Sequence, residues 1–242
     1  METRVDELAD GIYRLSTYLP DMAAPAGFTV NQFLIDAEEP LLYHCGMRSL
    51  FPLVSVAVRR ILPVDRLRWI CFAHLESDES GAMNHWLAAA PDAQIAHGAL
   101  GCELSINDLA ERPPRALTDG EVIDLGGKRV RHLDTPHTPH GWDSRVLFEE
   151  TTRTLLCGDV LSQVGDGSAV TESDILESAI VADEAFGSTA LGPHTAPAVR
   201  RLADLAPNVL AIMHGSSYAG DGATVLQSLA NYYDQRLRAA LG

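Results

Sequence analysis

The sequence predicts an α/β protein built as an αββα sandwich, in which two sheets lie between outer layers of helices. Short apolar runs typical of strands alternate with helical segments, and this order occurs twice along the chain. Several of the apolar runs end in histidine or acidic side chains, and α/β folds bind ligands at the carboxyl ends of their strands. A chain of 242 residues can bury one sizeable core, so we expect residues 1–242 to form a single domain.

The first half of the chain is expected to open with a β-meander and to continue with alternating helices and strands. Its predicted elements are strands at residues 11–15, 27–36 and 39–46, a helix at 50–62, a strand at 68–72, a helix at 80–90 and a strand at 93–97. A further helix is expected after the last of these strands. Ser80 is the expected N-cap of the second helix, because a serine side chain accepts hydrogen bonds from the first backbone N–H groups.

The second half is expected to contain two hairpins, followed by a strand between two helices. The hairpins span residues 121–133 and 144–157, the helices 195–205 and 222–241, and the strand 209–214. The Gly-Gly pair at 126–127 is a strong hairpin signal, because tight hairpin turns need residues that tolerate positive φ. The second half therefore repeats the order of strands followed by helices.

One imidazole and three carboxylates follow the strand at 68–72 within six residues: His74, Glu76, Asp78 and Glu79. Ionisable groups this close would repel one another unless a cation lay among them. The alternative is a solvated acidic loop before a helix, whose N-terminal dipole favours carboxylates. The segment therefore indicates half of a metal site or an acidic cap.

Three further segments place polar side chains after apolar runs. The first carries His137 and His140 in a loop between prolines, the second ends in Gly158-Asp159, and the third ends in His214. A single histidine or aspartate at a strand end is usually a turn or capping residue. Together with the segment around His74, these positions predict a metal centre.

The order H-x-E-x-D, then His, then Gly-Asp, then His-Gly resembles the metallo-β-lactamase superfamily. More narrowly, it resembles the diiron domain of flavodiiron proteins and related oxygen-binding diiron proteins. Glu76 stands where zinc hydrolases of the superfamily usually carry histidine. The segment at 140–144 keeps the His, Asp and Ser of the flavodiiron motif, which selects His140 over His137 as the ligand.

The resemblance implies two metal ions. The implied ligands are His74, Glu76, His140 and Asp159 for the first ion, and Asp78, Asp159 and His214 for the second, with Asp159 bridging. Glu79 departs from the pattern, because most relatives carry histidine there. Three roles are open for Glu79: it ligates the second ion, reaches it through water, or does not bind.

Two further residues have expected roles beside the ligands. Asp143 is expected to orient His140 through the free ring nitrogen of the imidazole, the usual arrangement behind a metal-binding histidine. His137 is a candidate pocket residue that could act as an acid or hydrogen-bond donor, with a plain loop role as the alternative.

The ligand set favours iron, with manganese and zinc as alternatives. A set rich in carboxylate oxygens suits iron or manganese better than zinc, which prefers more histidine or cysteine. Two ferrous ions carry four positive charges, and Glu76, Asp78, Glu79 and Asp159 supply four negative charges. This balance favours oxygen chemistry over zinc hydrolysis.

Composition excludes several other classes of protein. The net charge of −15, from 33 acidic and 18 basic residues, disfavours a nucleic-acid partner. No apolar run approaches the ~20 residues that cross a bilayer, and the first residues lack the apolar core of a signal peptide. The four cysteines form no C-x-x-C pair and are expected to be reduced core residues. We therefore expect a cytoplasmic protein that binds neither membrane nor nucleic acid.

The leading functional hypothesis is a non-haem diiron protein that binds dioxygen or nitric oxide. Flavodiiron enzymes receive electrons through an FMN domain, which we do not find in this sequence. We therefore expect either an oxygen sensor with a signalling partner or a reductase with an electron donor in trans, and a homodimer is compatible with both. The alternative is a metal-dependent hydrolase of a small ester, thioester or lactone. A metal-free binding module is the third hypothesis.

Overall fold

Two seven-stranded sheets form the centre of the protein, as the computed structural model of residues 1–242 shows. The first sheet contains, in spatial order, β1 (Thr3–Ala9), β2 (Ile12–Leu19), β3 (Phe28–Ile35), β4 (Leu41–Tyr43), β5 (Trp69–Cys71), β6 (Gln94–Gly98) and β7 (Arg115–Leu117). Its first four strands are antiparallel, and β4 to β7 are parallel. The expected β-meander is therefore confirmed.

The second sheet begins with the two predicted hairpins. Its strands are β8 (Val122–Asp124), β9 (Arg129–Asp134), β10 (Arg145–Glu149), β11 (Thr154–Leu156), β12 (Val170–Thr171), β13 (Val209–Ala211) and β14 (Ser217–Ala219). Their spatial order is β12-β14-β13-β11-β10-β9-β8. The Gly-Gly pair between β8 and β9 has positive φ at both residues, as the hairpin signal required.

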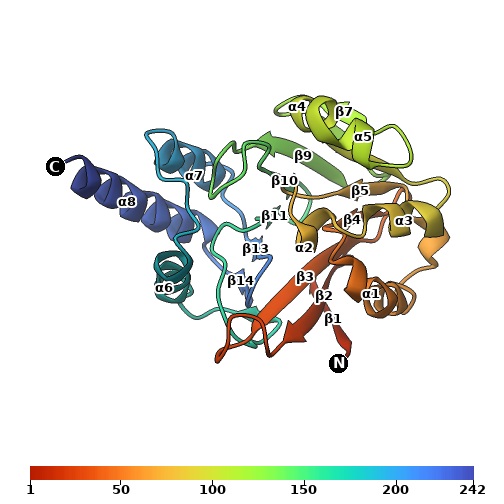
Figure 1. Cartoon of the computed structure of the whole chain (residues 1–242), viewed down its shortest axis with the longest axis horizontal. Coiled ribbons are helices and arrows are strands. Elements are labelled where there is room, and N and C mark those ends of the chain that lie inside the picture. The colour runs from red at the N-terminus through yellow and green to blue at the C-terminus, as the bar shows by residue number, and fades with distance from the viewer.

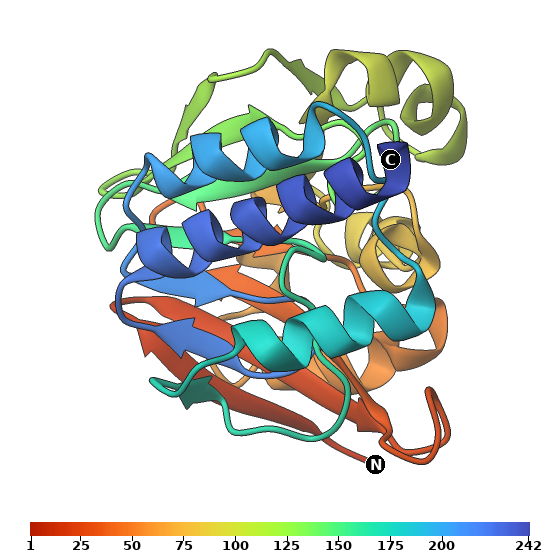
Figure 2. The same cartoon turned by 90° about the vertical axis from the view of Figure 1, so that its left-hand side faces the viewer.

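Helices cover the outer face of each sheet, which confirms the αββα sandwich (Figures 1 and 2). The helices are α1 (Phe51–Val58), α2 (Ser77–Ser80), α3 (Met83–Ala89), α4 (Ala99–Gly101), α5 (Asn107–Leu109), α6 (Leu176–Phe186), α7 (Thr195–Ala203) and α8 (Gly222–Leu241). Figure 2 shows α6, α7 and α8 lying across the second sheet. Three buried clusters fill the spaces between these layers, one between the sheets and one under each helical layer.

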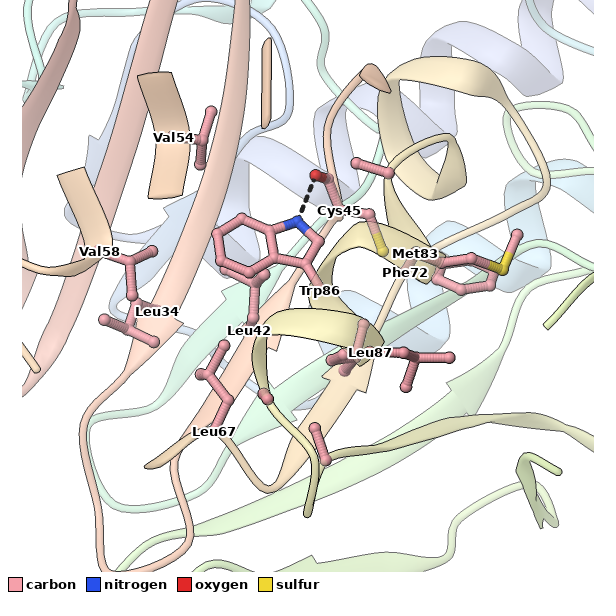
Figure 3. Packing of buried hydrophobic residues seen from close by; sticks show 14 of the residues in the cluster. Leu34, Leu42, Cys45, Val54, Val58, Leu67, Phe72, Met83, Trp86 and Leu87 are labelled. Atoms are coloured by element: carbon pink, nitrogen blue, oxygen red, sulfur yellow. Dashed lines mark hydrogen bonds between the residues drawn. The ribbon is translucent and has the colours of Figure 1, made fainter. Parts of the chain in front are cut away.

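Trp86 is the largest fully buried side chain and lies at the centre of the core under α1 and α3 (Figure 3). Its ring packs among aliphatic side chains, and its indole N–H donates a hydrogen bond to Cys45 O at 2.8 Å. Cys45 is buried, as are the other three cysteines, and none of the four is in a disulfide. The expectation of reduced core cysteines agrees with this arrangement.

A helix occupies most of the expected range 80–90, as α3, but the predicted N-cap is wrong. The backbone becomes helical at Ser77, so Ser80 is the last residue of α2, and its hydroxyl donates to Glu76 O. Gly81 and Ala82 lie between α2 and α3, and position 81 has no room for a side chain, because a Cβ there would lie 2.3 Å from Ser77 O. Asp78 and Glu79 therefore lie on a helical turn instead of an extended loop.

Five elements were not predicted, namely β1, β7, β12, β14 and α6. No helix combines the length and the apolar composition that a bilayer crossing would need.

Replacing Trp86 with phenylalanine should lower the free energy of unfolding by about 1–3 kcal/mol, because Cys45 O would remain buried without its donor. Urea denaturation of the metal-free protein measures this change. The matched control is Trp142→Phe, because Trp142 is an exposed tryptophan, and we expect a change within about 0.5 kcal/mol. Equal effects of the two substitutions would contradict the role given to this hydrogen bond.

Candidate metal centre

The predicted ligands converge at one edge of the sandwich from both sheets. His74 and Glu76 follow β5, and Asp78 lies on α2. The remaining ligands lie in the second half, with His140 between β9 and β10, Asp159 after β11 and His214 after β13. His74, Asp159 and His214 each follow a short strand that is mostly buried, so the sandwich fixes the backbone from which these side chains extend.

Four of these residues form one group: His74, Glu76, His140 and Asp159. One ligand atom from each lies within 4.8 Å of the others. Glu76 Oε1 is 3.6 Å from His74 Nε2 and 3.4 Å from His140 Nε2. Asp159 Oδ2 is 3.8 Å and 3.3 Å from the same two nitrogens. The group therefore offers two imidazole nitrogens and two carboxylates to one point.

Asp78, Asp159 and His214 form the second group. His214 Nε2 lies 3.3 Å from Asp78 Oδ2 and 3.2 Å from Asp159 Oδ1. Asp159 thus presents Oδ2 to the first group and Oδ1 to the second. A carboxylate in this position is suited to bridge two cations.

Strand β3 of the first sheet fixes the orientation of His214. The imidazole Nδ1 lies 2.7 Å from Thr29 O and must donate to it, because a carbonyl oxygen only accepts. In the neutral imidazole this leaves Nε2 without a proton, facing Asp78 and Asp159, as a metal ligand requires. Asn31 Nδ2 also donates to Ile212 O and to Gly215 O, which holds the same loop.

The electrostatics of the site favour positive charge. Burial alone would lower the pKa of His74, but the carboxylates of Glu79 and Glu76 raise it to about 12. Burial alone would also lower the pKa of His214, but the carboxylates of Asp159 and Asp78 raise it to about 10. Because the carboxylates stabilise a cation at the ring nitrogens, a divalent metal would displace protons there.

The donor set fits a metal pair that prefers oxygen ligands. His74 Nε2 is a buried nitrogen without a hydrogen-bond partner, and it faces two carboxylates. The two groups together supply three imidazole nitrogens and the carboxylates of Glu76, Asp78 and Asp159. This composition matches iron or manganese better than zinc.

Glu79 does not join either group, so of the three roles left open for it the geometry favours the one in which it does not bind a metal ion. Its Oε2 accepts the His74 backbone N–H at 2.6 Å and lies 3.3 Å from His74 Nδ1. It also lies 3.5 Å from His44 Nδ1. Glu79 therefore contacts His74 on the side opposite to Nε2. Consecutive residues on a helix point about 100° apart, so Asp78 and Glu79 of α2 cannot face the same point.

Glu79 is a buried carboxylate held between two imidazoles. Burial would raise the pKa of Glu79, but His44 and His74 hold it well below its usual range. The charged carboxylate is therefore suited to orient His74 and to increase the basicity of its ring. His44 is fully buried beside this carboxylate.

Asp143 does not contact His140, which corrects the expected pairing. Asp143 Oδ2 accepts the Leu75 backbone N–H at 3.1 Å and lies 3.4 Å from His97 Nε2. The His140 Nδ1 atom has no hydrogen-bond partner. Asp143 therefore holds the backbone beside His74, and its other neighbour is the buried His97.

His137 does not line the cavity at the metal centre, so its proposed role as an acid or donor in the pocket is wrong. The side chain is exposed, and its ring centroid lies 6.0 Å from that of His194. Its backbone has a positive φ of 60° and donates to Gly141 O. This turn directs His137 outward, while His140 faces Glu76.

These layers and the ligands at their edge define a metallo-β-lactamase-like protein by fold. The chain matches the family model described as ODP family beta lactamase over residues 28–215. The chain therefore belongs to this family.

Known proteins of similar sequence or structure are flavodiiron proteins and a hydrolase. Rubredoxin-oxygen oxidoreductase of Megalodesulfovibrio gigas is 23% identical over 88% of this chain and 55% of its own length. The solved structure of the Desulfovibrio gigas oxidoreductase superposes with a TM-score of 0.82 at 18% identity, covering 96% of this chain and 62% of the other.

Two further proteins are similar to this chain, one in structure and one in sequence. A diflavin flavoprotein A 5 fragment from Nostoc sp. PCC 7120 gives a TM-score of 0.81 at 16% identity, covering 98% of this chain and 96% of the fragment. Hydroxyacylglutathione hydrolase of Acidiphilium cryptum is 34% identical over 58% of this chain and 56% of its own length. The structural matches show the fold, and the chain spans about half the length of the oxidoreductase.

Replacing Glu79 with glutamine should weaken binding of the first metal ion by about 10–100-fold and leave the second nearly unchanged, because only His74 depends on this carboxylate. Competition titration with a chromophoric chelator measures both affinities. The control is Glu103→Gln, an exposed carboxylate outside the site. Selective loss of the second ion would instead restore Glu79 as a ligand.

Proposed function

We propose that the chain is a non-haem diiron protein that binds dioxygen or nitric oxide and reduces it with electrons from an external donor. The observation that carries this proposal is the position of Asp159, whose two oxygens face two separate groups of ligands. The names of relatives, rubredoxin-oxygen oxidoreductase and coenzyme F420H2 oxidase, support a role in oxygen reduction. We propose that the electron donor is a redox protein. If the chain is instead an oxygen sensor, its partner is a signalling protein.

The residues around the centre have distinct roles in this proposal. Two ferrous ions bound here would supply electrons and open coordination positions for a diatomic ligand. Glu76, with its side chain 49% exposed, lies at the solvent side of the first group, whereas His74 is buried behind it. Asp159 keeps the two groups at a fixed separation. Phe28 stacks on the His214 ring at 4.0 Å and excludes water from that side.

A metal-dependent hydrolase is the second candidate, and the match to hydroxyacylglutathione hydrolase favours it. In a hydrolase the metal pair would activate a water molecule for attack on an ester, thioester or lactone. Glu76 opposes this candidate, because it adds a hard oxygen ligand to the first group. Zinc is matched better by a site that contains more histidine.

Iron loading followed by exposure to oxygen tests the proposal. Protein made in iron-supplemented medium should contain two irons per chain, and the anaerobic ferrous form should develop a near-ultraviolet or visible band when oxygen is added. The Glu76→Ala variant should lose this band and at least half of the iron, because the first group loses a carboxylate. Glu103→Ala is the control, since this carboxylate is exposed and outside the site.

The rate at which the oxygen-induced band decays separates two forms of the proposal. Decay that accelerates with added reductant indicates a reductase, and a band that persists for hours indicates a sensor. Two tightly bound zinc ions, no response to oxygen and measurable thioester cleavage would contradict the diiron proposal and support the hydrolase.

A further inference from the structure

A cavity of about 470 Å³ extends from the candidate metal centre into the space beneath α6 and α8. The ligands Glu76, Asp78, His140, Asp159 and His214 line one end. Pockets of ~300–1000 Å³ hold organic molecules of many atoms. The cavity is therefore far larger than dioxygen or nitric oxide requires.

Apolar side chains form most of the rest of the cavity wall, and its polar part comes from Ser162, Asp183, Ser188, Thr189 and Tyr233. Phe28 stacks on His214 and meets Phe186 edge to face, with ring centroids 6.0 Å apart. Ala179 and Ala182 of α6 are buried in the wall, and Leu229 of α8 lies opposite in the same lining. Because two of these residues are alanines, space remains between the helices that larger side chains would fill.

The charges around the cavity limit the kind of molecule that fits. No lysine or arginine lines it. Asp183 is the one acidic lining residue outside the metal centre, and it is paired with Arg236 Nη1 at 2.6 Å and accepts hydrogen bonds from Thr189. Because Arg236 already neutralises this carboxylate, a charged group on a bound molecule would find no partner of opposite charge in the part of the cavity away from the metal centre. A polyanion such as a nucleotide is therefore disfavoured.

We infer that this cavity binds an amphipathic organic molecule, with its apolar body between α6 and α8 and an oxygen-containing head group at the metal centre. The position of the head group rests on the proposed diiron function, whereas the position of the apolar body rests on the cavity wall alone. The bound molecule is then a second substrate or an effector of the oxygen chemistry. An uncharged or singly charged molecule with a short hydrocarbon body fits the lining described above.

Alkyl hydroxamates provide a direct test, because the head group stays constant while the apolar body lengthens. We would load the protein with zinc, confirm two ions per chain, and titrate it calorimetrically with acetohydroxamate, butyrohydroxamate and hexanohydroxamate. Each buried methylene increases a binding constant by roughly fourfold. We therefore expect hexanohydroxamate to bind at least tenfold more tightly than acetohydroxamate. Equal affinity across the series would overturn the inference.

Two substitutions on α6 make the test specific to the cavity. Ala182→Phe fills the space beneath α6 and should abolish the gain with chain length, while acetohydroxamate binds as before. Val181→Phe is the matched control, because Val181 is 58% exposed and does not line the cavity. The same gain in Ala182→Phe as in the wild type would overturn the inference. Ala179→Leu replaces Ala182→Phe if the latter does not fold.

Metal-free protein separates this inference from the proposed function. If the chain takes up no metal ions, the diiron proposal fails. The midpoint temperature of thermal unfolding, measured with and without 1-hexanol, then tests the apolar part of the cavity. A midpoint raised in the wild type and in Val181→Phe, but unchanged in Ala182→Phe, would support the inference about the apolar body. No rise in the wild type would overturn it.

Discussion

The shared carboxylate of Asp159 is the constraint on which the rest of the site depends. Its two oxygens lie 3.3 Å and 3.2 Å from His140 Nε2 and His214 Nε2, so both ligand groups must be held around one short side chain. The protein meets this requirement by bringing loops from both sheets together. Gly158 allows the close approach, because it has a positive φ and a Cβ there would lie 2.7 Å from Ala73 Cβ. The site therefore forms only when the two sheets are packed against each other.

The sequence predicted the sandwich and the convergence of the ligands, because both depend on local patterns: apolar runs, glycine turns and polar side chains at strand ends. It could not predict the direction of Glu79, because that depends on where α2 begins. Asp143 was assigned the wrong histidine, since the approach of His97 is a tertiary contact. Thr29 carried a signal that was overlooked, because it is one of three polar residues, with Asn31 and Gln32, in a strand that is almost entirely buried. Helix α6 was missed, and the charged partner of its buried Asp183 is Arg236, 53 residues away.

The two sides of the metal centre differ in character. Behind His74, buried Glu79 supplies negative charge that acts through an imidazole, and the carboxylates of Glu76, Asp78 and Asp159 would face bound metal ions directly. Beyond His214, the wall is aromatic and apolar and opens into the cavity beneath α6. The first feature stabilises cations, and the second gives an organic molecule access to them. A diatomic ligand needs only the first, and this is why the cavity suggests a second molecule in the reaction.

Metal stoichiometry of Asp159→Asn and Asp78→Asn tests the central claim most directly. Asp159 faces both ligand groups, and Asp78 faces only the second. We predict two ions per wild-type chain, one in Asp78→Asn, and a loss of affinity at both positions in Asp159→Asn. Two ions bound with wild-type affinity in Asp159→Asn, or only one ion in the wild type, would contradict a dinuclear centre built around this carboxylate.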